Sequence, residues 1–391
     1  MTLFIFLLPW IFVLSSVQSR NYSTWMADNA LLLSSKTLGS ICLAATHNSA
    51  AYNLSNKVIN TEAHESSFAT FYSNLNNIVN ATGRSSDQLV RLFTDGIRAG
   101  SECITKSIYS QLTDGNRALD LRLSVFENDI YTAHVLQGPS LSDVLAQVWK
   151  FLYATNGEIV FMTLGHPYGF NRTYIDRLAL LLDLFVTSGL AITPAAYPND
   201  LLSYTYEQLV SKGRSRVIIV IDDTINPDFK SFFSTSLYSP PDGGSHKLYG
   251  SYTNTNNINT VIDHQTANYA HARKISAPAA MYMTLTPTYN DMISIIVSTV
   301  VADFHPLMRP LVLAGLRAIL ASENINDIDL TLTSLSDIYL RQNMIARRTN
   351  ILTIIQSTSL FLTKNSIFLI YTDFYENNRD IVDLAISYSL I

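Results

Sequence analysis

The feature that most constrains the fold is a helical pattern followed at once by a strand pattern. Residues 140–154 begin with Ser-Leu-Ser-Asp, which resembles a helix capping box, and carry apolar residues at helical spacing. Residues 159–164 then form a short apolar run that is typical of a buried strand. A tight succession of strand, helix and strand indicates a parallel sheet with crossover helices. The segment therefore predicts an α/β protein.

The same alternation continues along the chain. We expect a long polar loop over 226–259 and a leading segment over 20–37 that includes a short helix covering the barrel floor. Neither a second domain nor an internal repeat is visible. The expected helices are 84–98, 172–189, 201–212, two helices broken near Pro306 within 292–320, 343–359 and 379–389, and the expected strands are 41–45, 118–123, 131–134, 159–164, 217–221, 281–285 and 366–372.

The first nineteen residues are expected to lie outside the fold. Residues 3–14 are apolar but shorter than a membrane span of about twenty residues. Val17 and Ser19 suit a signal-peptidase site, although a charged n-region is missing. We expect 1–19 to be a cleaved signal peptide and the protein to be secreted, with an uncleaved anchor as the alternative. The glycosylation sequons that fit this route are Asn21, Asn53, Asn80 and Asn171.

Charge and cysteine content narrow the possible partners. A formal net charge of −5 argues against a nucleic-acid partner, which needs a basic face. The cysteines of the chain are Cys42 and Cys103. In a secreted protein they could form a disulfide, and we favour that prediction. A buried free thiol at Cys42 is the alternative, because Cys42 lies in an apolar strand pattern.

Polar residues stand where several predicted strands end. The apolar run 41–45 stops at Thr-His-Asn-Ser, so that His47 lies at a strand terminus. Asp120 and Arg122 alternate with leucines in the next strand pattern, and His134 closes the following one. Parallel barrels expose their chemistry at these carboxyl ends. Two imidazoles with an arginine suggest acid–base chemistry on a phosphate, whereas the plainer interpretation is ordinary polar residues at strand ends.

The order of these pieces resembles a known family. The series Thr46–Ser49, Asp120–Arg122, His134 and Glu158–Met162, with later segments at 216–222 and 370–374, resembles the X domain of phosphatidylinositol-specific phospholipase C over residues 35–391. The resemblance implies a single-domain, distorted TIM-type (β/α) barrel over 20–391. It also implies a phosphoric diester hydrolase that cleaves a phosphoinositide, or a glycosylated relative, at a membrane surface. We expect a monomer.

The resemblance also implies roles for individual residues. His47 would be the general base, His134 the general acid and Arg122 the phosphate-binding arginine. Asp120 occupies a position that is acidic in both bacterial and calcium-dependent members. Asp373 would orient His47, although it matches the family less closely and could be a simple strand-end aspartate. Substrate contacts are expected from Asn48, Arg122 and His166, and a structural role is equally open for His166.

The family contains calcium-dependent and metal-independent members, and the ligand types favour the second group. Calcium prefers six or more oxygen ligands, several of them carboxylates. Asn48 and Asp120 match two calcium ligands of the dependent members, but Arg122 replaces an acid and Gly165 stands in place of a glutamate. We therefore expect catalysis without a metal or another cofactor, with calcium as the disfavoured alternative.

Two other functions remain open. One is another phosphodiesterase on the same fold, of the glycerophosphodiester or sphingomyelin type. The other is a non-catalytic barrel that binds lipid or glycan, which Asn48 and Gly165 leave possible because they depart from the family pattern. Binding without release of phosphate would identify the second.

Overall fold

The computed structural model describes residues 21–59, 85–221, 248–284, 367–377 and 379–390, with isolated residues between 301 and 317. The leader over 1–19 and the helix expected at 343–359 lie outside the described residues, as do nearly all of 292–320 and most of the loop over 226–259. Within the described part of the chain, no helix has the length and apolar content that crossing a membrane requires.

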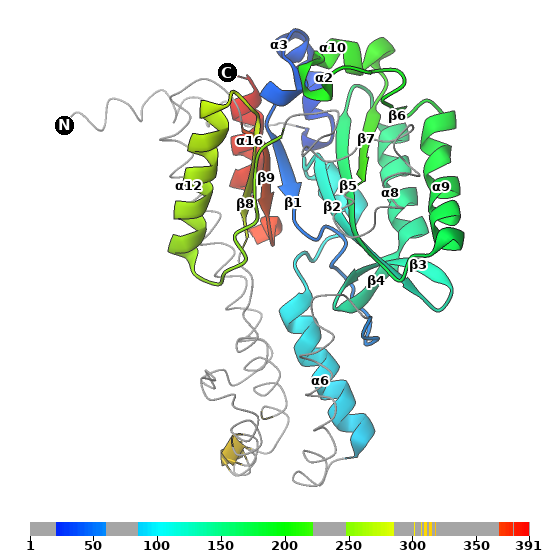
Figure 1. Ribbon diagram of the computed structural model, residues 1–391, viewed down its shortest axis with the longest axis vertical. Coiled ribbons are helices and arrows are strands. Elements are labelled where there is room, and N and C mark those ends of the chain that lie inside the picture. The colour runs from blue at the N-terminus through cyan, green and yellow to red at the C-terminus, as the bar shows by residue number, and fades with distance from the viewer. Residues whose placement is uncertain are drawn as a thin grey trace, which may run out of the picture.

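A nine-stranded sheet forms the centre of the molecule (Figure 1). Neighbouring strands along the main path β6-β7-β5-β2-β1-β9-β8 are all parallel, and β3 and β4 form an antiparallel hairpin beside β2. The architecture is the distorted TIM-type barrel that the sequence predicts. The strands are β1 (Leu43–Thr46), β2 (Ala118–Phe126), β3 (Asp129–His134), β4 (Leu136–Ser140), β5 (Ile159–Tyr168), β6 (Ala191–Ile192), β7 (Arg216–Ile221), β8 (Ala279–Met283) and β9 (Ile367–Thr372).

Two groups of helices lie to the left and to the right of the strands in Figure 1. Figure 1 shows α8 (Leu141–Ala154) and α9 (Arg172–Thr187) beside β5 and β7, with α12 (Ile258–Lys274) and α16 (Asp380–Leu390) beside β8 and β9. At the carboxyl ends of the strands lies α6 (Ser86–Ser101), and α7 (Ile108–Thr113) precedes β2. The short elements are η1 (Tyr22–Thr24), α2 (Trp25–Asp28), α3 (Ala30–Leu33), η2 (Leu38–Ser40), η3 (Leu201–Ser203), α10 (Tyr206–Leu209), η4 (Ser211–Gly213) and η5 (Tyr375–Asn377).

Strand alternation separates two apolar cores and sets the direction of the polar residues. In β5, Phe161 belongs to the core that includes β1 and β9, whereas Met162 belongs to the core beneath α8 and α9. In β2, Ala118 belongs to the first core and Leu121 to the second. Because successive side chains point to opposite faces, Asp120 and Arg122 share the face of Ala118, on the inside of the curved sheet.

A buried ion pair closes the amino ends of the strands. Nη2 of Arg117 lies 2.7 Å from Oε2 of Glu158, and both side chains are completely shielded from solvent. The guanidinium also donates to the carbonyls of Tyr22 and Ser23, while the other oxygen of Glu158 accepts the backbone N–H of Ala27. These bonds tie the leading segment across the barrel floor, as the sequence predicts, although with two short helices and one 3₁₀ turn instead of one helix.

Several parts of the secondary structure differ from expectation. The helix expected over 201–212 is broken into η3, α10 and η4, because Thr205 caps a new helix with Gln208 and Lys212 adopts a positive φ of 68°. Strands β4 and β6 and helix α7 were not predicted, and neither was helix α12. Its buried face includes Gln265, which bonds to Ser251, so the helix lacks a clear apolar stripe.

Candidate active site

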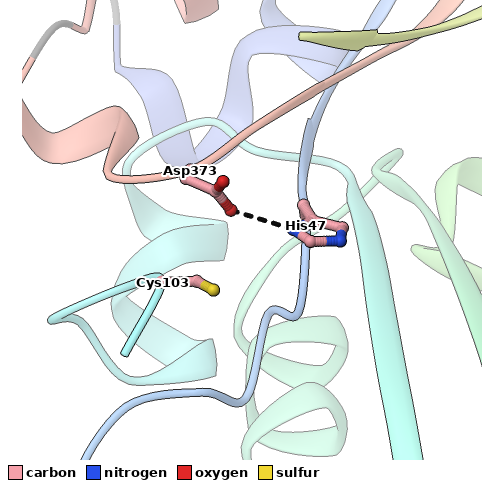
Figure 2. Close-up of side chains that lie close together, drawn as sticks. All are labelled: His47, Cys103 and Asp373. Carbon is pink, nitrogen blue, oxygen red and sulfur yellow. Dashed lines mark hydrogen bonds and ion pairs between the residues drawn. The ribbon is translucent and has the colours of Figure 1, made fainter. Parts of the chain in front are cut away.

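Strand register places His47 beside Asp373. Thr46 of β1 pairs in parallel with Thr372 of β9, and the N–H of His47 continues the ladder by donating to the Thr372 carbonyl. The next residues on the two strands therefore emerge side by side. Nδ1 of His47 lies 3.0 Å from Oδ1 of Asp373, and their side chains are 6% and 13% exposed (Figure 2). The expected pairing of these two residues is present.

Arg122 contacts the other nitrogen of the same imidazole. Its Nη2 lies 3.0 Å from Nε2 of His47. A guanidinium can only donate, so Nε2 must be the acceptor and the proton of the neutral ring resides on Nδ1. Nδ1–H then donates to Asp373. This tautomer leaves the lone pair of His47 on the side that faces Arg122, as a general base acting near a phosphate would require.

Asp120 holds the turn that follows β1. Its Oδ2 accepts the backbone N–H of Asn48, and its own N–H donates to Oγ of Ser49. Burial would raise the pKa of Asp120, but Arg122, followed by His47 and the hydrogen bond from Asn48, lowers it below its ordinary value. Asp120 is therefore a carboxylate at neutral pH. It positions the segment that carries His47.

Cys103 is a member of the site that the sequence did not predict. Its N–H donates to the Ala51 carbonyl, and its carbonyl accepts the N–H of Phe374, which fixes the segment across the carboxyl ends of β1 and β9. Figure 2 shows its thiol directed toward the Nδ1 side of His47. Sγ also lies 3.6 Å from Nδ1 of His134. Burial, and then the negative charge of Asp373, raises the pKa of the Cys103 thiol well above its usual range.

The disulfide favoured from the sequence is wrong, because Cys42 and Cys103 are both free and buried. Cys42 precedes β1 at its amino end, where its backbone bonds to Ser389, whereas Cys103 lies at the opposite end beside His47. A four-residue strand spans about 13 Å. Disulfide-bonded Cα atoms are usually less than about 7 Å apart.

His134, the expected general acid, ends β3 on the far side of Cys103. Its Nδ1 lies 2.6 Å from the carbonyl of Ser101, so this nitrogen carries a proton. A neutral His134 then has its lone pair on Nε2. The described contacts connect His134 to His47 through Cys103 and Asn48, because Nδ2 of Asn48 lies 3.7 Å from Sγ and 3.5 Å from Nδ1 of His47.

Two further side chains border the site. His166 is exposed near the end of β5. Burial opposes the lowering of the pKa of Asp120, and an electrostatic interaction with His166 adds to that lowering, after the stronger influences of Arg122 and His47. Tyr252 stacks on the His47 ring with centroids 5.3 Å apart. Tyr252 belongs to a loop that contains scattered aromatic residues and shows neither helical nor strand periodicity in its sequence. Only the fold reveals its contact with His47.

The residues around Asp120 do not fit a calcium ion. Arg122 shares the inner face of β2 with Asp120, and its positive charge acts on that carboxylate. Gly165 pairs with Arg122 in the adjacent strand and supplies no carboxylate. Among the described residues, the only group of three or more His, Cys, Asp or Glu side chains placed to hold a metal ion is His47, Cys103 and Asp373.

Comparison with known proteins agrees with this fold. The mouse PI-PLC X domain-containing protein 3 is 24% identical over 204 residues, which cover 50% of this chain and 58% of that protein. The zebrafish protein of the same name is 29% identical over 109 residues, which cover 27% of this chain and 33% of the relative. The chain thus spans less than two thirds of these relatives. No family model matches the sequence.

Solved structures extend the likeness over nearly the whole chain. A pentafluoro-Phe variant of phosphatidylinositol-specific phospholipase C from Staphylococcus aureus aligns with a TM-score of 0.53 and 11% identity, covering 93% of this chain and 97% of that structure. A second structure of the S. aureus enzyme, described for its membrane binding, gives 0.52 at the same identity and covers 94% and 97%. The protein therefore has the fold of a phospholipase C-type phosphodiesterase. Its sequence is similar, at low identity, to the PI-PLC X domain-containing proteins, in agreement with the resemblance of its motifs.

Proposed function

We propose that this chain is a secreted phosphodiesterase that cleaves phosphatidylinositol, or a glycosylated relative, at a membrane surface by two-histidine catalysis without a metal ion. One observation carries the proposal. His47 is held between a carboxylate on Nδ1 and a guanidinium on Nε2, both at 3.0 Å. An oriented base beside a permanent positive charge is what phosphoryl chemistry needs, and a histidine with a purely structural role would not need both.

The reaction would begin when the phosphate of the lipid attracts Arg122. The guanidinium exchanges its hydrogen bond to Nε2 of His47 for the non-bridging oxygens, where it stabilises developing negative charge. Nε2 is then available to accept the proton of the ring 2-hydroxyl. Asp373 stabilises the imidazolium that forms, because the carboxylate already accepts the Nδ1 proton.

The second half of the step transfers a proton to the leaving group. The 2-oxygen of inositol forms a bond to phosphorus while the bond to the glycerol oxygen breaks. A protonated His134 gives its Nε2 proton to that oxygen, so the products are a cyclic inositol phosphate and diacylglycerol. His47 ends protonated and His134 neutral, and hydrolysis of the cyclic phosphate in the reverse sense would restore both.

The test is release of water-soluble inositol phosphate from phosphatidylinositol vesicles by residues 20–391 expressed through a secretory host. Parallel samples contain EDTA. Variants His47→Ala and His134→Ala are compared with His271→Ala, which removes an exposed histidine of α12 outside the site. Each catalytic variant should lose about 10²–10⁴-fold in rate, whereas His271→Ala should keep the wild-type rate.

The other outcomes are equally informative. Release that EDTA abolishes would contradict metal independence. Release from glycerophosphodiesters or sphingomyelin instead of phosphatidylinositol would identify another phosphodiesterase. Vesicle binding without any release would show a non-catalytic lipid-binding barrel. In that case the contact between Arg122 and Nε2 of His47 would persist when lipid is bound and would keep the imidazole from acting as a base.

A further inference from the structure

Cys103 and Asp373 both lie on the Nδ1 side of the His47 imidazole, so that three side chains of types that can ligate a metal are close together (Figure 2). One ligand atom from each of His47, Cys103 and Asp373 lies within 4.8 Å of the other two. A tetrahedral Zn²⁺ site has bonds of about 2.0–2.3 Å, which correspond to ligand separations of roughly 3.3–3.8 Å. Small side-chain movements would therefore close this group around an ion. Imidazole, thiol and carboxylate are the ligand types that Zn²⁺ and its thiophilic analogue Cd²⁺ select.

Asn48 supplies a separate indication that a ligand belongs here. Its side chain is buried, with 3% of the residue exposed, and Oδ1 has no hydrogen-bond partner among the described residues. The amide instead presents Nδ2 to the cluster, 3.5 Å from Nδ1 of His47 and 3.7 Å from Sγ of Cys103. Because Nδ1 carries a proton, this contact joins two donors. A half-turn of the amide would direct its unpaired oxygen toward the same point.

We propose that His47, Cys103, Asp373 and Asn48 form an inhibitory site for a thiophilic divalent cation of the Zn²⁺ class. The site differs from a calcium site because its ligands include a thiol and lie on the Nδ1 side of the imidazole, away from Arg122. It rests on the proposed function only in being inhibitory; binding of the ion does not depend on turnover.

The proton balance explains why the bound ion would inhibit. The ion takes the lone pair of Nδ1, so the ring proton moves to Nε2, and the thiol of Cys103 releases its proton to solvent. Thiolate and carboxylate then neutralise the two positive charges of the ion, which suits a site shielded from water. Nε2–H can no longer accept the proton of a substrate hydroxyl. It also loses its hydrogen bond from Arg122, since both groups are then donors.

The binding test uses Cd²⁺ on the chelator-treated protein, because a Cd–thiolate bond produces an ultraviolet charge-transfer band. Cys103→Ala and Cys103→Ser are compared with Cys42→Ala, which removes the other buried cysteine, at the opposite end of β1. Wild type and Cys42→Ala should bind one Cd²⁺ with the band. Both Cys103 variants should lose the band and at least about 100-fold in affinity, because loss of a direct ligand costs no less than loss of an outer-shell partner. Circular dichroism checks that they remain folded.

The inhibition test uses Zn²⁺ in the vesicle assay, with each variant compared with its own rate in EDTA. Zn²⁺ should inhibit wild type and Cys42→Ala, and the Cys103 variants should require at least about 100-fold more Zn²⁺ for the same fractional loss, because they lack a direct ligand. A band that persists in folded Cys103 variants, or its absence in wild type, would overturn the site. Bound Cd²⁺ without inhibition of an active enzyme would overturn the inhibitory role. If wild type is inactive even in EDTA, the proposed function fails, whereas a Cd–thiolate band from Cys103 would still establish the site.

Discussion

Nη2 of Arg122 lies 3.0 Å from Nε2 of His47, so the arginine donates to the nitrogen with which His47 would accept a proton as a general base. A phosphate group competes with that nitrogen for the guanidinium, because a charge-assisted bond to an anion is stronger than a bond to a neutral imidazole. In the proposed mechanism, substrate binding and release of the base are thereby coupled through one side chain.

Replacing Arg122 by lysine should weaken this coupling. An ammonium is a compact point charge and cannot present the planar pair of donors that a phosphate accepts. We expect the rate of inositol phosphate release to fall by about 10²–10³-fold, as when a transition-state hydrogen-bond donor is removed. Arg172→Lys, at an exposed ion pair on α9, is the matched control. Equal rates for the two variants would remove Arg122 from the mechanism.

Asp373→Asn should leave the fold intact and lower kcat. An amide cannot stabilise the imidazolium and, if it donates to Nδ1, it favours the wrong tautomer of His47. The expected loss is about 10²–10⁴-fold, measured as inositol phosphate release at saturating vesicle concentration. Asp176→Asn changes an exposed carboxylate on α9 and should have no effect. A full rate in Asp373→Asn would support a simple strand-end role for this aspartate.

Arg117→Met should destabilise the protein by about 3–5 kcal/mol, because Glu158 would remain buried without its partner. Denaturant unfolding measures this change. The double variant Arg117→Met with Glu158→Leu should recover part of the loss, since it removes the uncompensated charge. Recovery would be incomplete because carbonyls including those of Tyr22 and Ser23 would lose their donors. A single variant as stable as wild type would refute the importance of this pair.

Asp120 should contribute to stability above pH ~4 and lose that contribution in acid. Its pKa in the folded protein is lower than the ordinary value of 3.8, so the unfolded chain binds the proton more readily. Stability therefore falls as the pH drops through the lowered folded pKa. Unfolding by urea at a series of pH values should show a shallower acid loss for Asp120→Asn than for wild type. Parallel curves would mean that Asp120 is not held as a carboxylate by Arg122.

The free thiols predict insensitivity to reductant. Burial raises the pKa of both Cys42 and Cys103, so little reactive thiolate is present in the native protein. Both should react slowly with a thiol reagent in the native state and rapidly after denaturation without reductant. The melting temperature should be the same with and without dithiothreitol. If the thiols react only after a reductant is added to the denatured protein, Cys42 and Cys103 form a disulfide after all.

The sequence predicted most of the regular elements near the site because their patterns are local. The apolar run ending at His47, the alternation around Asp120 and Arg122, and the capped helix α8 can all be identified without tertiary information. Helix α12 escaped prediction because it buries polar residues such as Gln265, whose partners lie on another segment.

The sequence by itself determined the parallel α/β class and the residue types at the strand ends, since both follow from local periodicity. Only the tertiary structure decided which of these residues meet. The register of Thr46 with Thr372 brings His47 next to Asp373, although most of the chain separates the two residues in sequence. The backbone bonds of Cys103 to Ala51 and Phe374 turn a presumed disulfide partner into a member of the site. Such pairings depend on hydrogen bonds between segments distant in sequence, which no local pattern encodes.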